Sequence, residues 1–195
     1  MNQKIQKLSL LSLMAALCYI GFTFFKIDIP LGNQTTAIHF GNTFCVLAAL
    51  MLGGVEGGLA GAIGMGIGDL LNPLYLPYFP KTFVLKFGIG CVTGFVAHKV
   101  FKLSAIKEGR SLTKAAFLSA GAGMLFNVVG EPIFGFFYNK YVFGVETTVA
   151  QVLAKITAGT TLFNAITATI LAGLFYLALR KALKNTSLSK KVFKQ

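Results

Sequence analysis

Six long apolar runs separated by short polar segments constrain the fold of this chain more than any other feature. The runs cover residues 8–25, 38–52, 55–71, 82–101, 115–138 and 149–179. A helix rises 1.5 Å per residue, so about 20 residues cross the roughly 30 Å hydrocarbon core of a bilayer. An open sheet cannot satisfy its edge groups in lipid. We therefore expect an all-α integral membrane protein, a single domain built as a bundle of six transmembrane helices.

The composition argues against the main soluble classes. Charged residues make up only 12% of the chain and hydrophobic residues 55%, whereas soluble domains carry roughly 25% charged residues. Such a chain cannot cover a water-facing surface, which disfavours a soluble enzyme and a disordered protein. Cys18, Cys45 and Cys91 lie apart in apolar runs, and without a CxxC pair they indicate neither a metal site nor a disulfide framework. We expect no cofactor or metal in this chain.

The basic residues predict the orientation in the membrane. Most of the 18 lysine and arginine residues precede the first run, separate the fourth from the fifth, or follow the sixth. With six crossings, these three groups lie on one side. The positive-inside rule then places both termini in the cytoplasm, with residues 183–195 as a basic cytoplasmic tail. The net charge of +12 is thus interpreted as a topology signal, and we expect no nucleic-acid partner.

Several polar residues whose placement in lipid costs free energy lie at one depth in the predicted bundle. A charge at the bilayer centre costs roughly 2.5–3.5 kcal/mol on insertion scales. The polar residues in question all lie within about two helical turns of the outer ends of their runs; they are His39, Asn42, Asp69, Lys86, Glu131 and Lys155. Scattered structural residues have no reason to share a depth. The pattern therefore predicts a polar cavity that opens outward.

Helical spacing groups the candidate binding residues on faces. Thr82 shares a face with Lys86, and Gln151 shares one with Lys155. A third face on the fifth run carries Asn127, Glu131, Phe134 and Tyr138, and Tyr78 stands in the outer loop before the fourth run. By the same count Asn164 points about 180° away from Lys155, so we rank it below Gln151 and Lys155. An internal lysine–glutamate ion pair that only holds helices together is the alternative.

Two further patterns concern helix geometry. Pro132 cannot donate a hydrogen bond and disfavours helical geometry at Glu131, so we expect Gly130-Glu131-Pro132 to interrupt the fifth helix. In the third run, Gly57, Gly61, Gly64 and Gly68 form a smooth face that lets another helix approach closely. This second pattern indicates packing rather than chemistry.

No catalytic motif accompanies these features. The sequence contains no GxxxxGK[ST], HExxH or GxSxG pattern, so it offers no Walker ATPase loop, zinc protease site or serine nucleophile. We therefore interpret the chain as a binder or conduit and not as an enzyme. A self-sufficient small secondary transporter or channel for a small polar solute is the alternative to a binding subunit.

Two segments resemble a known family. They are HFGNTFCVLAALMLGGVEGGLAGAIGMGIGDLL at residues 39–71 and PYFPKTFVLKFGIGCVTGF at residues 77–95. The first is similar to a GN/GD-T start, an LAALLLG stretch and a glycine-rich helix ending in DLL, and the second contains TF-x-x-K. In these motifs the chain resembles the substrate-capture (S) component of energy-coupling-factor (ECF) vitamin transporters.

The resemblance implies a membrane location, partners and a site. Such subunits are multi-pass proteins of the prokaryotic plasma membrane that bind a micronutrient from outside. They join a transmembrane coupling subunit and two ATPase subunits, which use ATP to drive uptake. The ligand lies in the outer half, under the loop after helix one and between helices four to six. Small residues of helix one meet the coupling subunit, and the corresponding residues here are Ser12 and Ala16.

The resemblance leaves the vitamin open. Relatives with these motifs resemble carriers of pyridoxine-type vitamins, pantothenate and riboflavin, and we favour a B6 vitamer or pantothenate, with riboflavin as a further candidate. If Lys86 and Lys155 both face the cavity, they suit the carboxylate of pantothenate. If Glu131 neutralises one of them, a neutral ring with hydroxyl groups fits better.

Overall fold

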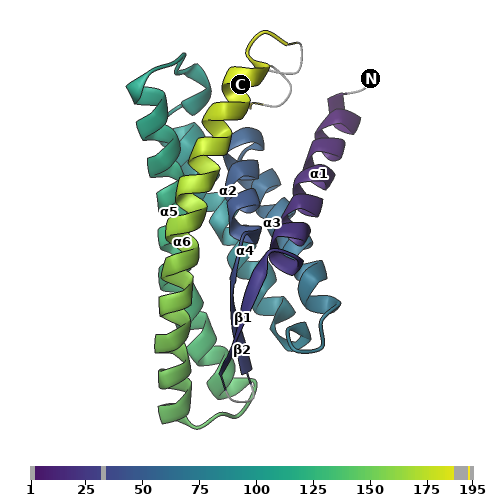
Figure 1. The fold of residues 1–195 in the computed structure, drawn as a ribbon, viewed down its shortest axis with the longest axis vertical. Coiled ribbons are helices and arrows are strands. Elements are labelled where there is room, and N and C mark those ends of the chain that lie inside the picture. The colour runs from purple at the N-terminus through teal and green to yellow at the C-terminus, as the bar shows by residue number, and fades with distance from the viewer. Residues whose placement is uncertain (1–2, 32–33, 187–192, 194–195) are drawn as a thin grey trace.

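The computed structural model describes residues 3–31, 34–186 and 193, and it contains the six predicted helices (Figure 1). Their bounds are α1 Gln3–Thr23, α2 Gly41–Leu52, α3 Gly54–Leu70, α4 Phe79–Phe95, α5 Arg110–Tyr141 and α6 Thr147–Leu183. A 3-10 turn, η1 (Leu76–Tyr78), precedes α4, and a π-helical turn, η2 (Val96–Val100), extends it. A second 3-10 turn, η3 (Leu103–Ala105), lies between η2 and α5.

Four helical segments within the described residues are long and apolar enough to cross a membrane: Ile5–Thr23, Leu76–Val100, Arg110–Tyr141 and Thr147–Leu183. The helices α2 and α3 are shorter, with 12 and 17 residues. Almost every residue of α2 is buried, because this helix lies between the others and faces protein on all sides. A helix that is apolar all round is stable only in such surroundings or in lipid.

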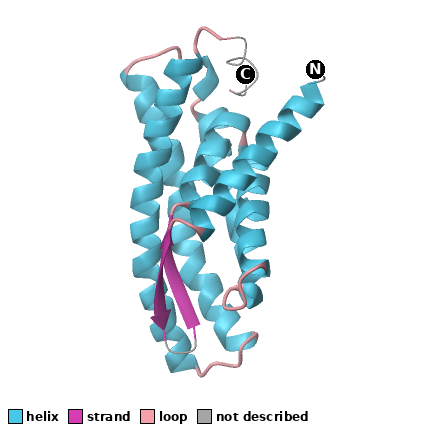
Figure 2. Ribbon diagram, turned by 45° about the vertical axis from the view of Figure 1, so that its right-hand side comes forward, coloured by secondary structure: helices cyan, strands magenta, loops and turns pink. Residues whose placement is uncertain are grey.

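A two-stranded hairpin, β1 (Lys26–Leu31) and β2 (Gln34–His39), occupies the segment expected to be a loop. The strands are antiparallel, and Lys26 pairs with His39. His39 therefore ends a strand and does not open the second helix, which begins only at Gly41. Figure 2 shows the strands (magenta) running along the helices, and β2 contacts α6. The signal that predicts this hairpin is Gly32-Asn33 between two β-prone runs.

The fifth helix continues through Pro132 without a break, so the predicted interruption is wrong. A proline removes one backbone hydrogen bond, here the one to the carbonyl of Val128, and leaves the others in place. Transmembrane helices tolerate this loss when neighbouring helices hold both halves. In this structure α6 lies beside α5 along its length (Figure 1).

The predicted glycine face of α3 does pack against other helices. A Cβ added to Gly57 would lie 2.3 Å from Ala49 Cα of α2, and one added to Gly64 would lie 2.2 Å from the carbonyl oxygen of Ala15 in α1. On the other side of α3, a Cβ added to Gly90 of α4 would lie 2.1 Å from the nitrogen of Gly58. Glycine is required at these crossings because the backbones leave no room for a side chain.

The two ends of the bundle are formed by different segments of the chain. The first turn of α1 and the last turn of α6 lie at one end, and the turn between α5 and α6 lies at the other, close to the hairpin (Figure 1). At the first end, Arg180 of α6 donates to the carbonyl of Leu103 at 2.9 Å and so anchors the segment before α5. The expected basic tail falls mostly on residues 187–192 and 194–195, which lie outside the described residues.

Candidate substrate-binding site

A polar cavity of about 90 Å³ lies at the hairpin end of the molecule. One wall comes from β2 and the end of β1, and the opposite walls come from α4, α5 and α6. The first turn of α2 and the last turn of α3 close the inner end through Asn42 and Asp69. This position, under the segment after α1 and among α4 to α6, is the one that the family resemblance implies.

Eight of the predicted binding residues line this single cavity, although they come from six separate segments. They are His39, Asn42, Asp69, Tyr78, Thr82, Lys86, Asn127 and Glu131. All except Tyr78 and Glu131 are buried, and Lys86 is only 5% exposed. The structure thus brings together polar groups that the sequence suggested only by their common depth.

The three other predicted binding residues lie outside the cavity. The hydroxyl of Tyr138 donates to the carbonyl of Pro77 at 2.6 Å and so holds η1 against α5. Gln151 and Lys155 line a separate groove on the outer side of α5 and α6. The cavity face of α6 instead carries Asn164, together with Ala154, Thr157 and Thr161. Asn164, which the sequence ranked below Gln151 and Lys155, is therefore the residue of the three that lines the cavity.

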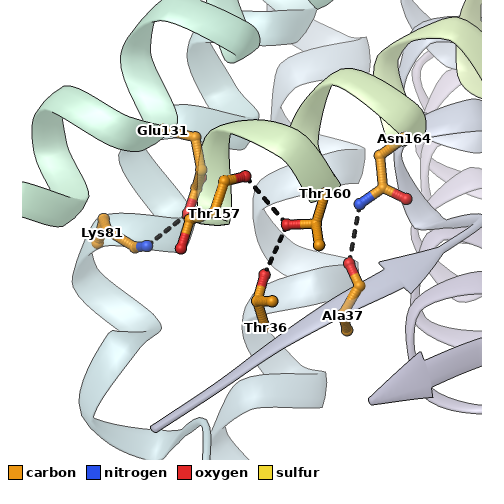
Figure 3. A network of polar contacts seen from close by, with 7 residues as sticks. All are labelled: Thr36, Ala37, Lys81, Glu131, Thr157, Thr160 and Asn164. Atoms are coloured by element: carbon orange, nitrogen blue, oxygen red, sulfur yellow. Dashed lines mark hydrogen bonds and ion pairs between the residues drawn. The ribbon is translucent and has the colours of Figure 1, made fainter. Parts of the chain in front are cut away.

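An ion pair joins α4 to α5 at the cavity wall. Lys81 Nζ lies 2.5 Å from Glu131 Oε1 (Figure 3), and these side chains are only 10% and 15% exposed. Lys81 stands between the third and fourth apolar runs, and it is not among the binding residues that the sequence predicts. One signal was available, because a lysine in the first turn of a helix opposes the helix dipole and calls for a specific acidic partner.

The strand β2 is fastened to α6 by polar contacts that Figure 3 shows. The side chain of Asn164 accepts from the backbone N–H of His39 at 3.0 Å and donates to the carbonyl of Ala37 at 2.9 Å. The hydroxyls of Thr36 and Thr160 lie 2.9 Å apart. The amide of Asn164 supplies an acceptor oxygen and a donor NH₂ group to the same strand, which suits an asparagine at position 164.

A second set of contacts holds the other strand. The hydroxyl of Tyr75, between α3 and η1, donates to Asp28 Oδ1 of β1 at 2.6 Å. Lys26 Nζ lies 3.1 Å from Asp28 Oδ2 and 4.4 Å from the centre of the Tyr75 ring. Burial and the neighbouring Asp28 raise the pKa of Tyr75, so its hydroxyl stays protonated and donates. We call Lys26, Asp28 and Tyr75 the hairpin clasp.

Several buried polar atoms around the cavity have no hydrogen-bond partner among the described residues. They are both side-chain oxygens of Asp69, both polar side-chain atoms of Asn42, Asn127 Oδ1 and His39 Nδ1. Buried polar groups are almost always satisfied, and each exception needs an explanation. Because these atoms converge on one cavity, a polar ligand that supplies the missing donors and acceptors explains them together.

The ionisable groups of the cavity balance in sign. Two carboxylates, from Asp69 and Glu131, face two ammonium groups, from Lys81 and Lys86. When all four are ionised their charges cancel, so the cavity has no excess charge to compensate a charged ligand. Among the described residues no group of three or more histidine, cysteine or acidic side chains is arranged to hold a metal ion.

Comparison with protein families identifies the kind of protein that carries this cavity. Residues 2–181 match the family described as ECF-type riboflavin transporter, S component. The chain belongs to this family. Searches of curated proteins gave no match, and searches of solved structures gave none either.

Family membership gives the chain its general role. It is an S component, a membrane protein that captures a vitamin and associates with an ECF transport module. The family consists of transporter components and not of enzymes. The apolar helices fit this role, since four of them have the length and hydropathy of membrane spans.

Proposed function

We propose that this S component captures a small, net-neutral vitamin with several hydroxyl groups, and that a B6 vitamer is the first candidate. The supporting observation is the cavity itself, which combines unpartnered donors and acceptors with two carboxylates and two ammonium groups. A pyridoxine-type ring carries hydroxyls and a ring nitrogen that suit Asp69, Asn42 and Asn127. A pyridoxine-type molecule has no net charge, and the four ionised groups of the cavity have none either.

Pantothenate and riboflavin fit less well, for different reasons. The carboxylate of pantothenate needs an unbalanced cation, but Glu131 pairs with Lys81 and Asp69 also lines the cavity that holds Lys86. Riboflavin is neutral, and the family name favours it. However, the cavity of about 90 Å³ is well below the roughly 300–1,000 Å³ usual for drug-sized ligands. A single-ring vitamin requires the smallest movement of the hairpin.

We further propose the topology and partners expected from the sequence. All six helices lie in the plasma membrane of a prokaryote, and both termini are cytoplasmic. The chain assembles with a transmembrane coupling subunit and two ATPase subunits, which hydrolyse ATP. The exposed face of α1 that includes Ser12 and Ala16 is the docking surface for the coupling subunit. A chain that moved vitamin alone, driven by a gradient in proteoliposomes, would contradict this assembly.

Ligand titration of the purified protein tests the choice of vitamin. The chain has no tryptophan, so binding can be followed by the fluorescence of pyridoxine or riboflavin without overlapping protein emission. We expect pyridoxine to bind, riboflavin to bind more weakly, and pantothenate not to compete. Tighter binding of riboflavin than of pyridoxine would overturn the B6 assignment and leave the vitamin-capture role intact.

Variants of the cavity test its location. Asp69→Asn removes a carboxylate acceptor, and because hydrogen bonds to charged groups contribute about 1.5–3 kcal/mol, the dissociation constant should rise at least tenfold. Gln151→Ala is the matched control, since Gln151 lies outside the cavity. Both proteins should unfold near the wild-type temperature. Unchanged affinity in Asp69→Asn would show that the vitamin binds elsewhere.

A further inference from the structure

A shallow groove of about 360 Å³ lies between α5 and α6, separate from the vitamin cavity. Its apolar floor comes from Pro132, Phe136 and Phe137 of α5, and its polar rim comes from Gln151 and Lys155 of α6. The cavity lies on the neighbouring face of α6, which carries Thr161 and Asn164, and Ala154 borders both the cavity and the groove. The groove therefore faces the surroundings of the protein, which for these two helices is the membrane.

Lys155 is an exposed cation in this groove. Among the described residues no carboxylate lies within 4 Å of its ammonium group, whereas Lys7, Lys26, Lys81 and Lys184 each have an acidic partner. A charge beside three apolar or aromatic side chains is costly unless an anion or water compensates it. An anionic group is therefore the partner that suits Lys155 in this groove.

The depth of Lys155 along α6 matches that of lipid headgroups. From Lys155 to Arg180 the helix runs for about 37 Å, slightly more than the roughly 30 Å hydrocarbon core. Exposed apolar side chains fill the interval; they are Ile156, Leu162, Phe163, Ile166, Ile170, Leu174 and Phe175. With Arg180 at one interface, Lys155 lies at the level of the phosphates of the other leaflet.

Aromatic side chains gather at the outer end of α5, roughly one to two turns outward of the level of Lys155. The rings of Phe137 and Tyr141 stack with centroids 6.0 Å apart, and Lys140 Nζ lies 5.4 Å from the Tyr141 centroid. Aromatic and basic residues gather where a protein passes through the membrane–water interface. The outer end of α5 therefore lies at the interface, just outward of the polar rim of the groove.

We propose that this groove binds an anionic phospholipid of the outer leaflet, with Lys155 paired to the phosphate. The amide of Gln151 donates to the same headgroup, and the first carbons of an acyl chain lie on Pro132 and Ile133. A free phosphate ion gains only the polar contacts, whereas a lipid gains the polar and the apolar ones. The bound lipid fixes the height of α5 and α6, and hence of the cavity, in the membrane.

Native mass spectrometry of the delipidated full-length protein, titrated with phosphatidylglycerol or phosphatidylcholine, tests the proposal. We expect one phosphatidylglycerol to bind more tightly than phosphatidylcholine. Lys155→Gln should weaken phosphatidylglycerol binding about fivefold, the factor that corresponds to about 1 kcal/mol for a lysine near a membrane surface. Lys155→Arg should keep the affinity, because a guanidinium also pairs with phosphate. Vitamin binding should not change in either variant.

Lys140→Gln is the matched control, since it removes the same charge at the same end of the molecule from outside the groove. Wild-type affinity in Lys155→Gln would overturn the proposal. An equal loss of phosphatidylglycerol affinity in Lys140→Gln would also overturn the proposal. The lipid would then be attracted by the overall positive charge at this end of the molecule and not by Lys155 in the groove. Displacement of the lipid by millimolar inorganic phosphate would identify a free anion as the ligand.

Discussion

At the scale of single residues, the pair of Lys81 and Glu131 is the least exposed of the salt bridges among the described residues. Both side chains are mostly withdrawn from solvent, and they join α4 to α5 beside the cavity. Taking two charges out of water costs several kcal/mol per ion, and mutual attraction offsets this cost only while both partners remain. The pair is therefore a contact that holds the cavity wall and also a part of its charge balance.

Removing one partner of this pair should be more harmful than removing both. Lys81→Met leaves Glu131 as an uncompensated, poorly solvated carboxylate, and we expect a loss of about 3 kcal/mol in unfolding free energy. The double variant Lys81→Met with Glu131→Gln should lose less than the sum of the single variants. Denaturant unfolding in detergent measures the unfolding free energy of the wild type, of both single variants and of the double variant. Strict additivity would mean that the two charges do not interact.

At the scale of elements, the hairpin is the part of the structure that covers the cavity. Its second strand is fastened to α6 through Asn164, and its first strand is fastened to the α3–α4 connection through the hairpin clasp. A vitamin cannot leave on the hairpin side unless one of these attachments opens. The strength of the clasp should therefore affect how fast the vitamin dissociates more than it affects which vitamin the cavity recognises.

Tyr75→Phe should accelerate vitamin release. The change removes the hydroxyl that donates to Asp28 and keeps the ring beside Lys26. A hydrogen bond to a charged group contributes about 1.5–3 kcal/mol, so we expect the dissociation rate to rise about tenfold in stopped-flow experiments. Asp28→Asn keeps an acceptor oxygen and serves as the milder comparison. An unchanged dissociation rate in Tyr75→Phe would show that the vitamin leaves by another route.

The clasp should also have a defined pH dependence. Because burial and Asp28 raise the pKa of Tyr75, the folded state favours the protonated hydroxyl. Its contribution to stability is then complete below the ordinary tyrosine pKa of about 10 and is lost only as the pH rises through the higher folded value. The Tyr75→Phe variant should accordingly differ from wild type by a constant factor throughout the physiological range.

At the scale of the whole molecule, the two ends of the bundle have different chemistry. Arg180 and the residues around Lys107 lie at the end where α1 begins, whereas the cavity and the α5–α6 turn lie at the other end (Figure 1). An uneven distribution of basic residues sets the orientation of membrane proteins. The basic end should therefore face the cytoplasm, and the cavity should face the outside.

Cysteine labelling in intact cells tests this orientation. In a variant without the three native cysteines, Val142→Cys should react with a membrane-impermeant thiol reagent, because Val142 is 58% exposed beside the α5–α6 turn. Lys107→Cys, in the exposed connection before α5, should react only after the cells are opened. The reverse pattern would place the cavity in the cytoplasm and contradict capture from outside.

The sequence by itself determined the class of the protein and its six helices, and it predicted that the polar residues lie near one depth. These properties depend on local hydropathy and on the cost of a charge in lipid, both of which can be read along the chain. The expected positions of Asp69, Lys86 and Glu131 near one level follow from that cost, and the three residues do line one cavity.

Only the tertiary structure decided which face of α6 meets the cavity, which lysine pairs with Glu131 and how the segment after α1 folds. In water, polar residues mark the outer face of a helix, but in a membrane both the lipid face and the packed face are apolar. The rotation of α6 that brings Asn164 inward and leaves Lys155 outside therefore has no local signature. It is fixed by contacts between residues more than a hundred positions apart, such as Asn164 with Ala37.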